Sequence, residues 1–403
     1  MVARYIKRDI EPELKQIITQ FPSLALTGPR QSGKSTTLIN LFGKTHKYLT
    51  FDDPVVRNRA LSDPKMFLDE YDTPVILDEI QYAPQILSYI KMNIDKNRNR
   101  TGRYIFTGSQ RFNLIKNIGD SLAGRIALVS LFPFSYKELS KNWLPEFSKY
   151  NSKDLFLMNC LRGSYPELVL NSGINMRKWY SSYIQTYLER DISTIYNIGN
   201  LRDFQRFIQI LAGRCSQKLN MNSLSSELGV SVNTVKSWVS ILEASNIIYL
   251  LYPYYKSGTK RLVKTPKVYF IDTGLVCYLT SLTDKEHILN GPMAGALFEN
   301  YCIQETIKQI THNDLNVTIS YLSTYNNDEI DLLIAHDMKI YPFEIKLTKS
   351  PGTGMAGIIE KMSLQYNLQK GKIICLSDDP IRLSKNVEAI NIQTFYTKIL
   401  SSF

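Results

Sequence analysis

Short apolar segments alternate with amphipathic segments along the first third of the chain. The apolar segments predict buried strands at residues 23–28, 46–53, 73–80, 102–109 and 125–132. The segments between them, such as residues 83–95, carry apolar side chains at the spacing of a helix. Buried strands that alternate with helices indicate a parallel sheet covered by helices on both faces. The pattern therefore predicts an α/β fold for this part of the chain.

The middle of the chain has a different pattern, in which helical segments precede a hairpin. Residues 141–205 have the spacing of helices, and residues 231–245 predict an amphipathic helix after a shorter helix and a glycine turn. The side chains of that helix expected to face inward are Val235, Trp238, Val239 and Leu242. Two strands joined by a basic, glycine-containing connection follow. This order of elements is that of a winged helix.

The last third predicts a helix followed by a β-hairpin. Residues 294–310 have the pattern of an amphipathic helix, and residues 329–335 and 338–348 read as two strands joined by a tight turn. The patterns together divide the chain into four segments. These are an α/β domain (1–140), a helical lid or linker (141–205), a winged-helix domain (206–280) and a second α/β domain (281–403).

Composition limits the setting in which the protein works. The chain has 403 residues, which is long enough for two or three domains. It has no apolar run of membrane-spanning length, and its charged amino-terminus lacks the apolar core of a signal peptide. Its five cysteines are dispersed without the spacing of a disulfide framework or zinc site. We therefore expect a cytoplasmic protein with reduced thiols and no membrane partner.

The formal net charge of +11 favours an anionic partner, such as nucleic acid or a nucleotide. Residues 96–116 hold six basic side chains and residues 254–267 hold five, and neither stretch contains an acidic side chain. A solvated basic surface is the alternative interpretation of the same charges.

The sequence Gly28-x-x-x-x-Gly33-Lys34-Ser35 lies between a predicted strand and a helical pattern, which is the setting of a phosphate-binding P-loop. The glycines let the backbone turn its amides toward a β-phosphate, and the helix that follows favours negative charge. Lys34 would contact the β- and γ-phosphates, and Ser35 would ligate Mg²⁺. We expect the phosphates of ATP or ADP to contact Gly28, Pro29, Arg30, Gln31, Ser32, Gly33, Lys34, Ser35 and Thr36.

Two adjacent carboxylates end the third predicted strand. Asp78 would hold Mg²⁺ through its water shell, and Glu79 would orient or deprotonate the attacking water. Ser109, after the fourth strand, would sense the γ-phosphate, although a simple turn explains the same residues. Arg125, before the fifth strand, would reach a neighbouring subunit's nucleotide as an arginine finger or else pair with a local carboxylate. The candidate catalytic residues are thus Glu79, Lys34, Ser109 and Arg125.

A series of motifs in the first third resembles the AAA+-type ATPases of bacteria and archaea. The motifs are GPRQSGKST (28–36), FDDP (51–54), LDEIQYAP (77–84) and TGS (107–109). Three later motifs resemble the group of these ATPases whose second half is a domain of unknown function: GRIALVSLFPFSYKEL (124–139), RGSYPELV (162–169) and YIQTYLERDI (183–192). The resemblance covers nearly the whole chain. It implies an ATPase core, a winged-helix segment and a C-terminal nuclease-like fold.

If the winged helix binds DNA, its second helix would enter the major groove and its hairpin would contact phosphates. The candidate contacts are Asn233, Thr234 and Lys236 on the helix, and Lys256, Lys260, Arg261 and Lys264 on the hairpin. Winged helices also serve as protein-docking modules, and the sequence leaves that alternative open.

The last candidate site lies in the predicted C-terminal hairpin. Glu344 and Lys346 are two residues apart and share one strand face, and Asp331 lies on the opposing strand. With Glu299 on the preceding helix, they resemble the PD-(D/E)xK nuclease site of restriction-endonuclease-like folds. Paired carboxylates would hold Mg²⁺ beside a scissile phosphate, and Lys346 would position water or stabilise developing charge. Such folds also occur as binding domains without cleavage.

The sequence as a whole predicts a Mg²⁺-dependent ATPase that acts as a nucleotide-controlled switch on double-stranded DNA. Two alternatives remain: an ATP-gated DNA nuclease that uses the C-terminal site, and a signalling scaffold whose winged helix and nuclease-like fold bind protein. We expect a monomer or a homo-oligomer whose association depends on the nucleotide.

Overall fold

The computed structural model describes residues 5–71, 73–108, 122–142, 150–187, 201–254, 265–324, 326 and 328–403. The chain folds into two compact units. The first comprises Met1–Phe134 with the short segments Ala244–Asn246 and Thr311–Asp314. The second comprises Ser135–Glu243, Ile247–Ile310 and Leu315–Phe403. Within the described ranges, no helix combines the length and the apolar character needed to cross a membrane.

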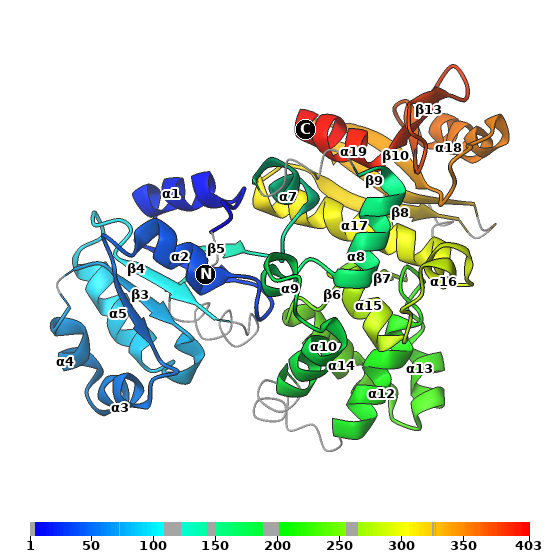
Figure 1. Ribbon diagram of the computed structural model, residues 1–403. Helices are drawn as coiled ribbons and strands as arrows, with labels where there is room; N and C mark the ends of the chain where they lie inside the picture. The colour runs from blue at the N-terminus through cyan, green and yellow to red at the C-terminus, as the bar shows by residue number, and fades with distance from the viewer. Residues whose placement is uncertain are drawn as a thin grey trace. The chain divides into compact units, whose positions relative to one another are not determined.

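The first unit is built on a sheet that has five strands within its described residues, drawn in blue to cyan in Figure 1. They are β1 (Ser23–Thr27), β2 (Lys47–Thr50), β3 (Val75–Asp78), β4 (Tyr104–Thr107) and β5 (Ile126–Ser130). Their order across the sheet is β2-β3-β4-β1-β5, and every neighbouring pair is parallel. The predicted α/β fold with a parallel sheet is confirmed. Parallel order brings the carboxyl ends of β1, β3 and β4 to one edge.

Helices cover both faces of this sheet, because alternate residues of each strand point into two separate cores. The helices are α1 (Glu11–Gln20), α2 (Lys34–Phe42), α3 (Pro54–Ser62), α4 (Pro64–Asp69) and α5 (Ile86–Lys96). Leu24 and Leu26 of β1 pack in the core that α1 and α2 share. Ala25, between them, packs in the opposite core with α3, α4 and α5.

The second unit begins with helices and a short hairpin. Its helices before the last sheet are α7 (Tyr136–Asn142), α8 (Ser152–Arg162), α9 (Pro166–Leu170), α10 (Met176–Thr186), α12 (Leu201–Ala212), α13 (Met221–Leu228), α14 (Val232–Ala244), α15 (Thr273–Leu279), α16 (Lys285–Asn290) and α17 (Ala294–His312). The strands β6 (Ile248–Leu251) and β7 (Lys267–Phe270) pair antiparallel. A further bridge joins Lys218, between α12 and α13, to Lys267.

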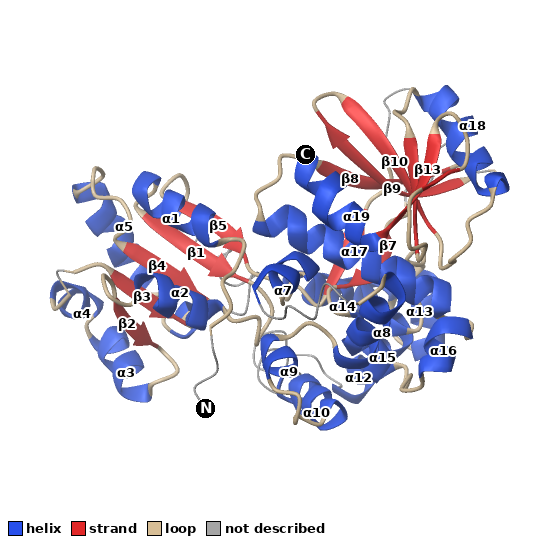
Figure 2. Cartoon of the chain, turned by 45° about the horizontal axis from the view of Figure 1, so that its top comes forward, coloured by secondary structure: helices blue, strands red, loops and turns tan. Residues whose placement is uncertain are grey.

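A mixed sheet, with six strands in the described residues, completes the second unit (Figure 2). Its strands are β8 (Thr318–Ser323), β9 (Glu329–His336), β10 (Lys339–Ile345), β11 (Gly371–Cys375), β12 (Ile381–Arg382) and β13 (Val387–Asn391). The order is β12-β13-β11-β10-β9-β8, in which β10, β11 and β13 are parallel and the other pairs antiparallel. The helices α18 (Gly357–Tyr366) and α19 (Ile392–Thr394) accompany it.

The β9–β10 hairpin forms where the sequence predicts one, with the turn one residue later. Asp337 and Met338 are the two connecting residues, and both have positive φ angles (46° and 63°). A two-residue loop with both residues in the left-handed region is the turn that matches the twist of paired strands. The turn thereby fixes the register that places Leu332 opposite Phe343.

A buried carboxylate joins three parts of the helical region. Asp272 is 1% exposed and caps α15 by accepting a hydrogen bond from the Leu275 amide at 2.8 Å. It also accepts from the amide and the hydroxyl of Ser164, each at 2.7 Å, and from the hydroxyl of Tyr180 at 2.5 Å. Gly163 beside it has a φ of 76°, and a Cβ there would lie 2.0 Å from the Tyr180 hydroxyl. The glycine and serine of the RGSYPELV motif therefore have a structural role.

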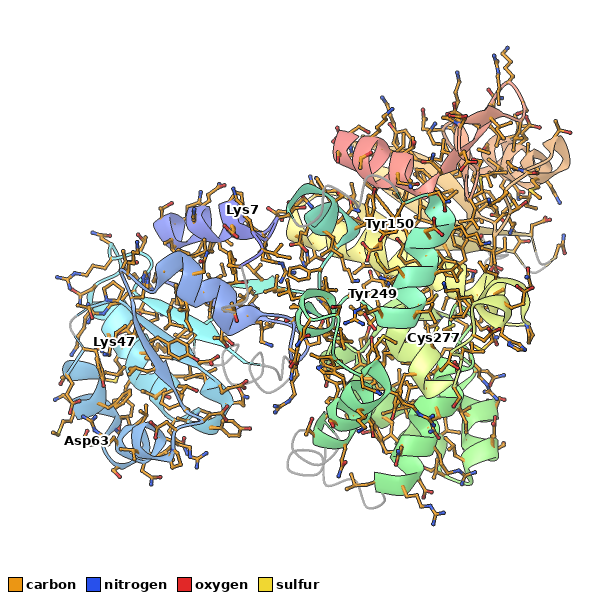
Figure 3. All side chains as sticks on the ribbon, in the orientation of Figure 1. Lys7, Lys47, Asp63, Tyr150, Tyr249 and Cys277 are labelled. Carbon is orange, nitrogen blue, oxygen red and sulfur yellow. The ribbon has the colours of Figure 1, made fainter. Side chains whose placement is uncertain are left out.

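All five cysteines of the chain lie in the described residues and are buried, free thiols. Cys277, which Figure 3 labels, belongs to α15. Burial raises the pKa of the Cys160 and Cys215 thiols. A raised pKa keeps a thiol protonated and therefore unreactive toward oxidants and metals.

Candidate functional site

The loop between β1 and α2 has the backbone conformation that phosphate binding requires. Gly28, Gln31 and Gly33 have φ angles of 141°, 62° and 94°. A Cβ at position 28 would lie 2.1 Å from the carbonyl oxygen of Leu131, so only glycine fits there. The loop leads directly into α2, whose first amides have no partner within the helix. These amides and the helix dipole favour an anion at this place.

Lys34 is the first residue of α2, and its side chain is buried in the bend of the loop. Its Nζ donates hydrogen bonds to the carbonyl oxygens of Gly28 at 3.0 Å and Pro29 at 2.9 Å. The ammonium group is thus held beside the amides that a phosphate would contact. A phosphate there would meet both a positive charge and backbone donors.

A polar cluster surrounds Asp78 at the end of β3. The Ser35 hydroxyl lies 3.1 Å from both carboxylate oxygens of Asp78, and the Thr107 hydroxyl donates to Oδ1 at 2.9 Å. Tyr48 donates to Oδ2 at 2.5 Å, and burial together with this carboxylate raises the pKa of Tyr48. Side chains from α2 and from the two strands that flank β3 thus fix one carboxylate. The hydroxyl and carboxylate oxygens are the kind of ligand that Mg²⁺ prefers, so the residues fit that ion.

Glu79 follows Asp78 with a strained backbone. Its φ of 53° places a residue other than glycine in the left-handed region, where such residues are uncommon. Its carboxylate is half-buried and accepts a hydrogen bond from Nε2 of Gln81. Backbone strain of this kind costs about 1–3 kcal/mol and concentrates at functional sites. Glu79 thus directly follows Asp78, the residue that the polar cluster holds, in a conformation that interrupts the strand.

Three residues of this site were given no role from the sequence: Tyr48 and Arg8 lie in no motif, and Thr107 belongs to the TGS motif, in which Ser109 was the candidate. Tyr48 and Thr107 contact Asp78, and neither belongs to the loop or to the acidic pair. Arg8 is buried, and its guanidinium donates to the carbonyls of Ser32 at 2.9 Å and Phe132 at 2.7 Å. Arg8 therefore ties the loop to the segment after β5. A short polar side chain at the end of a strand next to β3 was the signal available for Thr107.

The remaining candidate catalytic residues are Ser109 and Arg125. Ser109 lies outside the described residues. The Arg125 guanidinium forms a two-pronged pair with Asp95, at 2.7 Å from Nε and 3.0 Å from the second nitrogen. A third hydrogen bond joins it to the Ala123 carbonyl at 2.9 Å. This geometry favours the local pairing over the arginine finger within one chain, and the finger stays a prediction.

The helix α14 displays polar side chains opposite its buried face. Asn233 and Lys236 are exposed, and Thr234 is half-buried near the start of the helix. The inward face consists of Val235, Trp238, Val239, Ile241 and Leu242. The hairpin candidates Lys256, Lys260, Arg261 and Lys264 lie outside the described residues.

The C-terminal candidates converge on one cluster. Lys346 Nζ lies 2.6 Å from Oε1 of Glu344 and 3.8 Å from Oδ2 of Asp331. Glu299 of α17 joins them through Lys267, whose Nζ lies 2.9 Å from Glu299 and 3.4 Å from Asp331. The structure therefore brings together the four residues that the sequence placed on a helix and two strands.

Burial and mutual repulsion act on the carboxylates of this cluster. Burial and the nearby charge of Asp331 raise the pKa of both Glu299 and Glu344 to about 7. Burial acts to lower the pKa of Lys346, but the charges of Asp331 and Glu344 outweigh it and the pKa is raised. The lysine therefore stays charged among carboxylates that ionise with difficulty.

Three further charged residues, Glu329, Lys267 and Lys218, belong to the cluster and carry no sequence signal for it. Glu329 of β9 lies 2.6 Å from Lys267 and 2.8 Å from Lys218. Lys267 is the first residue of β7 and belongs to the basic stretch at residues 254–267. Basic stretches are more often solvated, and for that reason the sequence does not mark this lysine as buried.

Comparison with family models divides the chain into three matched segments. Residues 20–140 match an AAA domain. Residues 153–286 match a domain of unknown function (DUF8612), and residues 294–395 match another (DUF4143).

Comparison with whole proteins finds similar chains in bacteria and archaea. An uncharacterized protein of Mycobacterium tuberculosis is 28% identical over 348 residues, which are 86% of this chain and 75% of that protein. An uncharacterized protein of Methanocaldococcus jannaschii is 26% identical over 294 residues, 67% of this chain and 64% of that protein. Among solved structures, a Walker-type ATPase of Pyrococcus abyssi aligns with a TM-score of 0.43 and 14% identity, covering 68% of this chain and 96% of the other. The chain carries a P-loop AAA domain, followed by segments that match domains of unknown function.

Proposed function

We propose that this chain is a Mg²⁺-dependent ATPase whose nucleotide site is the loop 28–36 together with Asp78 and Glu79. The observation that carries the proposal is the hydrogen bonding of Ser35 to Asp78, beside a loop whose bend holds Lys34. The match of residues 20–140 to an AAA domain supports it, because such domains bind nucleotides.

Each residue of the site has a role that follows from its position. The loop amides and Lys34 would bind the β- and γ-phosphates, and Ser35 and Asp78 would hold Mg²⁺. An ion held by Ser35 and Asp78 would supply positive charge against the negative charge of the phosphates. Tyr48 and Thr107 would keep the Asp78 carboxylate in one orientation. Glu79 would accept the proton of the water that attacks the γ-phosphate.

Removing the Lys34 charge tests this assignment. We expect Lys34→Ala to lower ATP turnover by about 10²-fold or more, because a charge-assisted contact to the transferred phosphate is lost. Lys47→Ala is the matched control, since Lys47 is exposed at the start of β2 in the same unit (Figure 3). The measurement is steady-state phosphate release with Mg²⁺. Equal turnover of Lys34→Ala and the wild type would contradict the proposal.

We further propose that residues 206–280 form a winged helix that binds duplex DNA under nucleotide control. The order α12, α13, α14 and the β6–β7 hairpin supports this, together with the bridge between Lys218 and Lys267 that adds a second short pairing. The exposed start of α14 offers amide and ammonium donors for bases and phosphates. We also propose a lid or linker for residues 141–205 and a restriction-endonuclease-like fold for residues 281–403.

Charge reversal on α14 tests the DNA proposal. We expect Lys236→Glu to weaken duplex binding by roughly tenfold at low salt and to flatten its salt dependence, because a phosphate contact is replaced by repulsion. Lys398→Glu, on an exposed residue far along the chain, is the control. Fluorescence anisotropy with ADP and with a slowly hydrolysed ATP analogue measures both affinity and nucleotide control. Identical affinity in all proteins and nucleotide states would favour the protein-docking alternative.

A further inference from the structure

The carboxylates that resemble a nuclease site already hold a cation that the chain itself supplies. We propose that the ammonium group of Lys267 occupies the place that a divalent metal ion takes in a metal-dependent nuclease, and thereby keeps this site free of metal. The residues of this cluster all belong to the second unit, and the proposed ATPase site has no part in it.

The position of Lys267 is defined by three carboxylates. Its Nζ lies 2.6 Å from Oε1 of Glu329, 2.9 Å from Oε1 of Glu299 and 3.4 Å from Oδ1 of Asp331. Three is also the number of hydrogens that an ammonium group donates. The Lys267 side chain is only 4% exposed, so water cannot take over these contacts. All three of its hydrogens can therefore be directed at carboxylate oxygens of the cluster.

A metal ion in the same place would need the same oxygens. Mg²⁺ binds oxygen ligands at about 2.0–2.1 Å and Ca²⁺ at about 2.3–2.6 Å. An ion bound to Glu299 Oε1 and Asp331 Oδ1 would therefore lie within a few ångströms of the Lys267 ammonium. Like charges that close repel strongly where little water screens them. The metal and the ammonium exclude one another.

The oxygens of Asp331 and Glu344 that do not contact Lys267 also have partners, with one exception. Oδ2 of Asp331 accepts the Ile345 amide at 2.9 Å, and Lys346 holds Oε1 of Glu344. Oε2 of Glu344 is buried without a hydrogen-bond partner in the described part of the chain. A single oxygen of this kind does not make a metal centre. Over the described residues, no group of three or more histidine, cysteine, aspartate or glutamate side chains is arranged to hold a metal ion.

The charges of the cluster nearly balance without a metal. Four carboxylates (Glu299, Glu329, Asp331 and Glu344) face three ammonium groups (Lys218, Lys267 and Lys346). Since Lys267 is the first residue of β7, the cation comes from the hairpin that precedes the nuclease-like part. The residues present therefore do not fit a divalent metal while β7 is in place.

The test compares Mn²⁺ and Tb³⁺ binding by the nucleotide-free wild type and Lys267→Met, which keeps the length of the side chain and removes its charge. Tyr269, whose hydroxyl lies 2.6 Å from Glu299, is close enough to sensitise the luminescence of bound Tb³⁺. We expect Lys267→Met to bind Mn²⁺ at least about tenfold more tightly than the wild type. We also expect Mn²⁺ to raise the melting temperature of this variant and not that of the wild type.

Two further variants locate the effect. Lys267→Arg keeps the positive charge and should bind no more Mn²⁺ than the wild type. Adding Asp331→Asn to Lys267→Met should abolish the gain. An unchanged Mn²⁺ affinity in folded Lys267→Met would overturn the proposal.

If Lys267→Met does not fold, a comparison of the wild type with Asp331→Asn tests the proposal instead. Mn²⁺ binding or plasmid cleavage that Asp331→Asn removes from the wild type would overturn the proposal. Binding that is the same in the wild type and Asp331→Asn, with no Asp331-dependent cleavage, would support it.

Discussion

Glu79→Gln should leave ATP binding intact and lower turnover by about 10²–10⁴-fold, because the amide cannot accept a proton from the attacking water. Glutamine has nearly the shape of glutamate, so the turn at Glu79 and its contact with Gln81 can persist. The measurement is single-turnover hydrolysis with Mg²⁺, combined with a nucleotide titration on the same protein.

The control is a second glutamate-to-glutamine change in the same unit. Glu70 pairs with Arg59 on the surface, and such exposed pairs contribute about 0–1 kcal/mol. Glu70→Gln should therefore keep both turnover and affinity. A Glu79→Gln protein that hydrolyses ATP at the wild-type rate would remove Glu79 from the mechanism.

Asp272→Ala should lower the free energy of unfolding of the second unit by about 4 kcal/mol, because it removes a buried acceptor of several hydrogen bonds. The Ser164 and Tyr180 donors would lose their partner in a site without access to water. All three tryptophans (Trp143, Trp179 and Trp238) fall within Ser135–Glu243 of that unit. Tryptophan fluorescence in a urea titration therefore reports its unfolding.

Asp284→Ala is the control, because it measures how much the loss of an exposed helix cap lowers the free energy of unfolding. Asp284 caps α16 by accepting the His287 amide at 3.0 Å, and its side chain is 58% exposed. The cost of its removal should be about 1 kcal/mol. If both substitutions lowered the free energy of unfolding equally, the buried hydrogen bonds of Asp272 would contribute no more to stability than an exposed helix cap does.

The parallel sheet of the first unit could be predicted because each of its strands is recognisable from a few consecutive residues. Each strand is a short apolar segment, and residues such as Leu24 and Ala25 point to opposite faces by alternation alone. The loop at Gly28 and the carboxylate of Asp78 could be predicted for the same reason, since Gly28 directly follows β1 and Asp78 is the last residue of β3. The strands β1 and β3 end earlier than predicted, because the loop at Gly28 follows β1 directly and the turn at Glu79 follows β3 directly.

The partners of these residues could not be predicted, because they depend on which strands become neighbours. Thr107 reaches Asp78 only because β4 lies between β1 and β3. Arg8 meets Phe132 across 124 positions of the sequence. Lys267 is the strongest example: its neighbours in sequence are basic and favour a solvated charge, and only the packing of β7 against β9 and α17 buries it.

We propose above that the loop near Lys34 and the carboxylate of Asp78 together bind an adenine nucleotide. Isothermal titration of ADP and of a slowly hydrolysed ATP analogue into the nucleotide-free protein, with Mg²⁺, tests it most directly. We expect saturable binding to the wild type that is at least about tenfold weaker in Lys34→Ala. A folded wild type that takes up neither nucleotide at millimolar concentration, or that binds both no better than Lys34→Ala does, would contradict it.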